Sequence, residues 1–155
     1  EGRDEDPTRI KKVLLLTSIG TSRASSFPFV ILNLFGVLDA KREAEEALVA
    51  AAEEGGFSYV IVRPGRLIGG PWTNADIAGL LKLESSGGMG GSKVEAGDEL
   101  VGDASRDRVA KACIMALVNA VAADIDFAVV DDDDALPFSR DEWGRLLGSL
   151  AGPET

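Results

Sequence analysis

The sequence predicts an α/β fold built around a parallel sheet, and three observations lead to that prediction. Short apolar runs rich in branched side chains lie within residues 12–18 and 58–63, and such runs are typical of strands buried on both faces of a sheet. A stretch with helical periodicity, residues 37–54, separates them. A third run of the same kind lies at residues 126–130, after another helical stretch. This alternation predicts that the three runs are neighbouring parallel strands joined by right-handed crossovers.

The helix predicted over residues 37–54 places a lysine, Lys41, beside its apolar face. Five positions step along the chain by four, three, four and four residues and therefore share one face of a helix: Val37, Lys41, Ala44, Leu48 and Ala52. Two interpretations of Lys41 remain open. Its aliphatic stem can lie along apolar surface while the ammonium group reaches water. Alternatively, the ammonium group can donate hydrogen bonds to a hydroxyl-rich or phosphate-bearing ligand in a pocket.

The first two predicted strands both end in residues that stop a strand. The first runs into a turn that contains Ser18, and the second is stopped by Arg63-Pro64-Gly65. Proline cannot donate a ladder hydrogen bond, and glycine tolerates the turn that follows. Ligands of open parallel sheets bind beyond the carboxyl ends of the strands. We therefore expect Ser18, Lys41 and Pro64 to gather at one edge of the sheet, where the functional site lies.

The remaining elements follow from capping residues and local periodicity. We predict a short helix at 75–82, a hairpin of edge strands at 93–96 and 99–102, and helices at 105–121 and 140–150. Ser105 is the predicted N-cap of the first long helix. Ser139 and Glu142 form a capping box at the start of the last helix, and Phe138 and Trp143 have the spacing of a hydrophobic staple.

Composition excludes several classes of function. The 155 residues fit one domain, and a hydrophobic content of 45% is that of a folded chain. A formal charge of −10 argues against nucleic-acid binding, which needs a basic surface. The chain has no histidine and one cysteine, Cys113, so it offers neither a thiolate zinc site nor an internal disulfide, and we predict no metal site. No apolar run reaches the roughly 18 residues expected of a membrane-spanning helix.

Three segments of the chain resemble a known family. They are LLLTSIG at 14–20, GVLDAKREAE at 36–45 and GFSYVIVRPGRL at 56–67, and SRDRVA at 105–110 follows them in the same order. Together they resemble atypical short-chain dehydrogenase/reductases, and more narrowly the NmrA-like NAD(P)-binding members common in plants, algae and cyanobacteria. The resemblance covers roughly residues 10 to 130.

This resemblance implies an architecture, a cofactor and a location. The fold would be the carboxyl-terminal part of a Rossmann-type parallel sheet with flanking helices. A partial NAD(P)-binding domain would then occupy residues 10–150, between a polar lead-in at 1–9 and a tail at 151–155. The plant and algal character of the family implies a plastid protein, and otherwise a soluble intracellular one.

The resemblance also implies roles for individual residues. Lys41 takes the place of the lysine that contacts the nicotinamide ribose. Ser18 falls in the region of the active-site serine, and Arg63, Pro64 and Gly65 would border the nicotinamide. These five positions are the candidate cofactor-binding residues.

The chain departs from the family pattern in two ways. The tyrosine that precedes the lysine by four residues and relays the proton is replaced by Val37. The glycine-rich turn that cradles the pyrophosphate, with an acidic residue about 20 positions later, has no counterpart in the sequence. We therefore expect this chain alone to bind NAD(P) weakly or not at all and to lack reductase activity.

An apolar run from Phe27 to Phe35 suggests a second class of function. It lies in the connection between the first strand and its helix, where it either packs inside the domain or remains exposed. An exposed apolar patch of this size usually marks a partner. The partner would be an amino-terminal half-domain or another protein. The alternative to a cofactor-binding domain is thus a non-catalytic structural or interaction subunit of a larger complex, such as a plastid photosynthetic complex.

Overall fold

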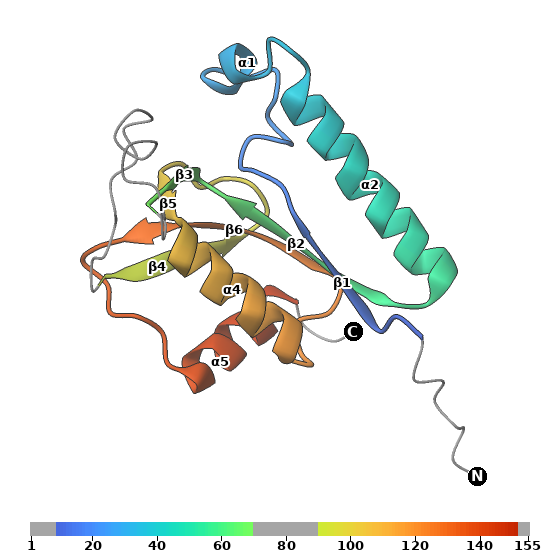
Figure 1. The fold of residues 1–155 in the computed structure, drawn as a ribbon, viewed down its shortest axis with the longest axis vertical. Helices are drawn as coiled ribbons and strands as arrows, with labels where there is room; N and C mark the ends of the chain where they lie inside the picture. The colour runs from blue at the N-terminus through green and yellow to red at the C-terminus, as the bar shows by residue number, and fades with distance from the viewer. Residues whose placement is uncertain (1–8, 70–89, 152–155) are drawn as a thin grey trace, which may run out of the picture.

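A mixed four-stranded sheet carries helices on both of its faces (Figure 1). The computed structural model describes residues 9–69 and 90–151. The strand order is β1-β2-β6-β4, and a separate two-stranded sheet pairs β3 with β5. The strand bounds are β1 Lys12–Leu16, β2 Ser58–Pro64, β3 Arg66–Ile68, β4 Gly91–Ala96, β5 Asp103–Ser105 and β6 Ile125–Asp132.

The three strands predicted from apolar runs are confirmed as parallel neighbours. β1 pairs with β2 with Leu14 opposite Val60, and β2 pairs with β6 with Val62 opposite Phe127. Within the described residues, no strand pairs with the other side of β1, so β1 forms an edge of the sheet. It is an unusual edge, because the run Lys12–Leu16 is largely apolar and most of it is half-buried on both faces.

The hairpin predicted from strands at 93–96 and 99–102 is wrong. β4 instead pairs antiparallel with β6, and residues 99–102 form no strand. The reason lies at the turn after β4. Asp98 accepts hydrogen bonds from the backbone N–H groups of Gly20 and Ser22, at 2.6 and 2.8 Å, and this contact directs the chain across the sheet. Leu100 is then buried there instead of pairing with β4.

The helices predicted from periodicity are confirmed with small changes of boundary. Their bounds are α2 Val37–Gly55, α4 Arg106–Val118 and α5 Arg140–Leu150. A further short helix, α1 Phe29–Leu32, was not predicted and lies within the apolar run at 27–35. The capping box of Ser139 and Glu142 is present in both directions. Phe138 contacts Trp143 edge to face, with ring centroids 5.2 Å apart. Ser105 holds the N-cap position of α4, but its hydroxyl bonds to Asp131 rather than to the helix.

Two further points concern the helices. The helix predicted at 75–82 lies outside the described residues. In the described part of the chain, no helix is both long enough and apolar enough to cross a membrane.

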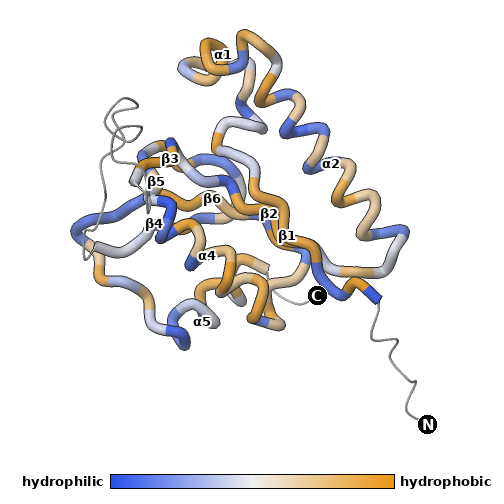
Figure 2. Tube along the Cα trace, viewed as in Figure 1, coloured by the Kyte–Doolittle hydropathy of each residue, from blue (hydrophilic) through white to orange (hydrophobic). Residues whose placement is uncertain are grey.

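Two apolar clusters hold the layers together, one on each face of the sheet. The larger unites one face of the sheet with α4 and α5 and includes Val62, Phe127 and Trp143, all at most 2% exposed. The smaller lies on the α2 side and includes Phe29, Leu38, Leu100 and Val130. Burial of one such side chain stabilises the fold by about 1.5–3 kcal/mol. Figure 2 shows the apolar residues concentrated along the strands and α4, and also at α1.

The face that α2 turns to the sheet differs from the predicted one. The buried residues of α2 are Leu38, Glu45 and Ala52, whereas Val37 and Ala44 are exposed. The helix is therefore rotated from the apolar stripe by about one position. The cause is electrostatic, because Glu45 lies against a buried arginine of the sheet and this ion pair sets the rotation.

Candidate functional site

The carboxyl ends of β1 and β2 lie side by side, as the sequence predicts. The N–H of Thr17 donates to the carbonyl of Val62 at 2.9 Å, and the N–H of Ile19 donates to the carbonyl of Pro64 at 3.0 Å. Ser18 lies between these two bonds and is half-buried. The backbone of β1 and its following turn is thus fixed beside Pro64. We call this strand-end region the cofactor edge.

Lys41 reaches the cofactor edge from the first turns of α2. Its Nζ donates to the carbonyl oxygen of Thr17 at 3.0 Å, immediately before Ser18. The side chain is half-buried rather than extended into solvent. The ammonium group is thus held inward beside the ends of the strands, and its role in ligand binding stays a prediction. Its remaining two N–H donors are available to a ligand that enters at this edge.

Gly65 allows a close approach of two backbone segments. A Cβ atom at this position would lie 2.2 Å from the carbonyl oxygen of Gly102. The N–H of Gly65 donates to the carbonyl of Val129 at 3.0 Å, and the next residue, Arg66, donates to Gly102 at 2.9 Å. The glycine therefore joins the end of β2 to β6 and to the segment that leads into β5.

Arg63 is directed away from the cofactor edge, toward α2. Arg63 is 3% exposed, and its guanidinium donates to both carboxylate oxygens of Glu45, from Nε at 3.0 Å and from Nη2 at 2.9 Å. The Nη1 group contacts Asp126 on β6. The structure thus brings Ser18, Lys41 and Pro64 together and places the Arg63 side chain in a separate network beneath the helix.

Glu45 is the residue at this site that the sequence analysis missed. It is 1% exposed and accepts hydrogen bonds from the hydroxyls of Thr17, at 2.6 Å, and Thr21, at 3.2 Å, in addition to those from Arg63. Burial raises the pKa of Glu45, but the hydrogen bonds from Arg63, Thr17 and Thr21 outweigh burial and lower the pKa below its ordinary value. The carboxylate therefore stays ionised at neutral pH.

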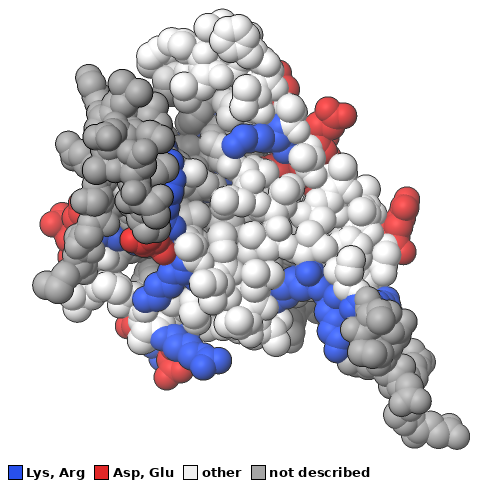
Figure 3. All heavy atoms as spheres, viewed as in Figure 1, with Lys and Arg blue, Asp and Glu red and all other residues white. Residues whose placement is uncertain are grey.

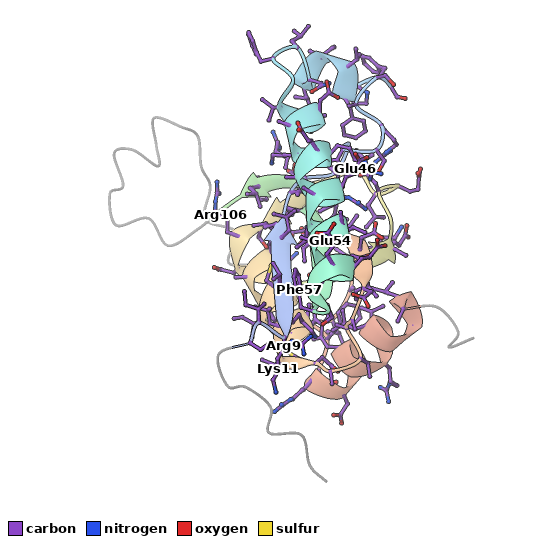
Figure 4. The ribbon with its side chains drawn as sticks, turned by 90° about the vertical axis from the view of Figure 1, so that its right-hand side faces the viewer. Arg9, Lys11, Glu46, Glu54, Phe57 and Arg106 are labelled. Atoms are coloured by element: carbon purple, nitrogen blue, oxygen red, sulfur yellow. The ribbon has the colours of Figure 1, made fainter. Side chains whose placement is uncertain are left out.

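The position of Glu45 explains how Lys41 is held. The two residues are one helical turn apart on α2, and both bind Thr17, one through the side-chain hydroxyl and one through the carbonyl. Figure 4 shows α2 running alongside β1, which brings this helix surface against the strand. The available signal in the sequence was the spacing of Glu45, four residues after Lys41, with an arginine in the following strand.

Comparisons with known proteins show which proteins this chain is similar to. No protein-family model matches the chain. A stretch of 58 residues is 52% identical to "Protein TIC 62, chloroplastic" of Arabidopsis thaliana. It is 50% identical to the proteins of the same name from Oryza sativa subsp. japonica and Pisum sativum. The stretch is 37% of this chain and 8%, 11% and 10% of the three relatives, so the chain matches only about a tenth of their length.

Two solved structures share the fold. An NAD-dependent epimerase/dehydratase from Bacillus halodurans superposes with a TM-score of 0.59 at 22% identity, over 90% of this chain and 52% of that one. The oxidoreductase ylbE from Lactococcus lactis superposes with a TM-score of 0.63 at 16% identity, over 94% of this chain and 55% of that one. The chain thus spans about half the length of each.

These findings confirm the resemblance on which the sequence analysis relied. The fold is a Rossmann-like α/β fold, with a mostly parallel sheet flanked by helices. The relatives matched in sequence are all chloroplastic proteins, which fits the plastid type of the resemblance.

Proposed function

We propose that this chain is the nicotinamide-facing, carboxyl-terminal half of an NAD(P)-binding domain of the atypical short-chain dehydrogenase/reductase type, in a plastid protein. The observation that carries the proposal is the convergence of Ser18, Lys41 and Pro64 at the cofactor edge, from three different elements. Ligands of open parallel sheets bind at this end of the strands. Lys41 would donate to the ribose hydroxyls, and the Pro64-Gly65 turn would border the nicotinamide ring.

The tyrosine chemistry of the family does not fit this chain. The chain has one tyrosine, Tyr59, and it lies near the amino end of β2, opposite to the cofactor edge. Val37, which stands four residues before Lys41, has no proton to transfer. A proton relay through a phenol acidified by the lysine therefore has no donor here. The proposed role is to bind a nicotinamide nucleotide, without catalysis of its reduction by this chain.

The open edge of β1 supports a second part of the proposal, that another half-domain packs against this strand. The N–H of Thr17 donates to β2, and along a parallel strand the backbone groups of successive residues point alternately to the two sides. The N–H and carbonyl groups of Leu14 and Leu16 therefore point to the unpaired side. A parallel apolar strand with an open row of backbone groups is suited to a further strand. Half of each structural neighbour lies outside the match. A half-domain at this edge would supply the helix N-terminus that binds the pyrophosphate.

Calorimetric titration with NADPH tests the need for that half. We expect no micromolar affinity from the chain alone, because its sequence has no counterpart of the glycine-rich turn that cradles the pyrophosphate. Micromolar binding by the isolated chain would contradict the proposal that a second half is required.

A second candidate function is that of an interaction subunit, and the run from Phe27 to Phe35 favours it. Phe29 is buried in the core on the α2 side, but the residues around it are exposed. Phe27 is 80% exposed and Phe35 is 93% exposed, and Ile31, Leu32 and Leu34 are also exposed. In Figure 3 the tip of the molecule around α1 is an uncharged surface. This surface fits a protein partner, since an amphipathic membrane anchor would add a basic face.

Substitution of the exposed residues separates these roles. Ile31→Ser with Leu34→Ser removes apolar surface without touching the core, whereas Phe29→Ser removes a buried ring. We expect the double variant to keep its thermal stability and to lose association, measured by analytical ultracentrifugation and by binding to chloroplast protein complexes. Loss of folding in the double variant would show that the run is internal core and would contradict the interaction role.

A further inference from the structure

A groove separate from the cofactor edge lies between α2 and the sheet. Its volume is about 420 Å³, within the range of small-molecule sites. Ser18, Lys41, Pro64 and Gly65 do not line it. The lining comes from α2, from β2, from the segments that follow β1 and β4, and from one residue of β6.

The groove combines an apolar wall with an aromatic ring. Val49 and Ala50 of α2 face Ile61 of β2, and Tyr59 lies toward the end of the groove at the start of β2. Such a wall accepts a short hydrocarbon stem. The face of a tyrosine ring attracts a cation placed within about 6 Å of it.

The charges in the groove are unevenly matched. Four carboxylates line it with two guanidinium groups, and both arginines are already engaged. Arg42 binds Glu46 at 2.8 Å, and Arg63 is held by Glu45 and Asp126. Among the described residues, Glu53 has no cationic partner within 4.0 Å. The groove therefore carries an excess of negative charge beside its apolar wall.

The surroundings of Tyr59 carry the same negative charge. Burial raises the pKa of the Tyr59 phenol, and the negative charges of Asp124, Asp126 and Glu53 raise it further. Three carboxylates thus act on one ring at the end of the groove. A positive charge placed there would be attracted by all of them.

We propose that this groove binds an organic cation, an alkylammonium or guanidinium group carried on a short apolar stem. The cation lies between the carboxylates of Glu53 and Asp126 and the ring of Tyr59. The stem lies along Val49 and Ile61. The proposal is independent of nucleotide binding at the cofactor edge, because Glu53 and Tyr59 lie toward the amino end of β2, whereas the cofactor edge lies at its carboxyl end.

The test is a titration of the whole chain with agmatine, followed by the amide and Tyr59 ring signals in NMR spectra. Saturable shifts confined to the groove are expected, and 4-guanidinobutyrate, in which a carboxylate replaces the amine, should bind less tightly. Glu53→Gln should weaken agmatine binding about fivefold or more, a change of about 1 kcal/mol. Both Glu53 and the control residue Glu54 are exposed on α2, so neither variant should disturb the fold.

The matched control separates a site from general attraction to a chain of charge −10. Glu54→Gln removes the same charge one residue away, but Glu54 does not line the groove. We expect less than a twofold effect from it. Tyr59→Phe should retain binding because it keeps the ring, and Tyr59→Leu should lose it. Equal weakening by Glu53→Gln and Glu54→Gln, or shifts spread over the whole surface, would overturn the proposal.

Discussion

Removal of the Glu45 carboxylate is the substitution that most sharply tests how α2 is held on the sheet. Glu45 is 1% exposed and binds Arg63 through two hydrogen bonds and the hydroxyls of Thr17 and Thr21. Loss of one partner of a buried ion pair costs about 3–5 kcal/mol. Asp126 continues to face Arg63, so we expect Glu45→Gln to lie at the lower end, near about 3 kcal/mol.

Urea unfolding followed by circular dichroism measures this cost. With a slope of about 2 kcal/mol per molar urea, the midpoint should fall by about 1.5 M. The neighbouring variant Glu46→Gln is the control, because Glu46 is exposed and pairs with Arg42 on the helix surface at 2.8 Å. That pair contributes only about 0.3–0.5 kcal/mol. A Glu45→Gln chain within about 0.5 kcal/mol of the unmodified chain would refute the claim that this ion pair anchors α2.

Three further predictions concern the pH dependence of stability, two glycines and the edge strand β1. The folded-state pKa of Glu45 lies below the ordinary 4.5, so the ionised carboxylate stabilises the fold above that pH, and this stabilisation is lost as the pH falls below it. Glu45→Gln should therefore make the free energy of unfolding depend less on pH between about pH 5 and 3. Gly65→Ala should destabilise the fold by about 1–3 kcal/mol through backbone overlap, whereas Gly148→Ala on α5, where a Cβ atom meets only ordinary contacts, should stabilise it by up to about 1 kcal/mol in thermal melts. Hydrogen exchange should be fast at the Leu14 amide and slow at the Leu15 amide, and equal protection would mean that the edge of β1 is already covered in solution.

The sheet was predictable because each of its parallel strands corresponds to a local apolar run in the sequence. Residues 12–18 and 58–63 are too short and too branched for buried helices, and the helix between them forces a parallel crossover. The last helix was predictable to the residue, since Ser139 and Glu142 cap it by contacts that span only three positions.

The errors have a different physical origin, because they depend on contacts between distant segments. Residues 99–102 read as a strand, but Asp98 binds backbone groups of the turn after β1, more than 70 positions away. The rotation of α2 likewise depends on Arg63, 18 positions from Glu45. A prediction from apolar periodicity assigns every glutamate to the solvent-facing side, so the predicted buried face contained Ala44 instead of Glu45.

In the candidate site, too, some features could be predicted from the sequence, and others depend on contacts between distant residues. The gathering of Ser18, Lys41 and Pro64 follows from parallel topology alone, because the carboxyl ends of parallel strands share one edge. The direction of the Arg63 side chain does not follow from topology, since successive residues of a strand alternate between faces and the partner decides which contact forms. That partner is Glu45, 18 positions before Arg63 in the chain, and the contact between them forms only in the folded protein.

Chemical-shift mapping with nicotinamide mononucleotide tests the proposed function most directly, because this probe carries the nicotinamide ribose without needing the pyrophosphate cradle. We expect millimolar, saturable shifts at Ser18, Lys41 and Gly65, and their loss in Lys41→Ala. Lys93→Ala on β4, which removes the same charge at the edge of the sheet opposite to β1, should retain them. Shifts absent at the cofactor edge, or unchanged by Lys41→Ala, would contradict the account.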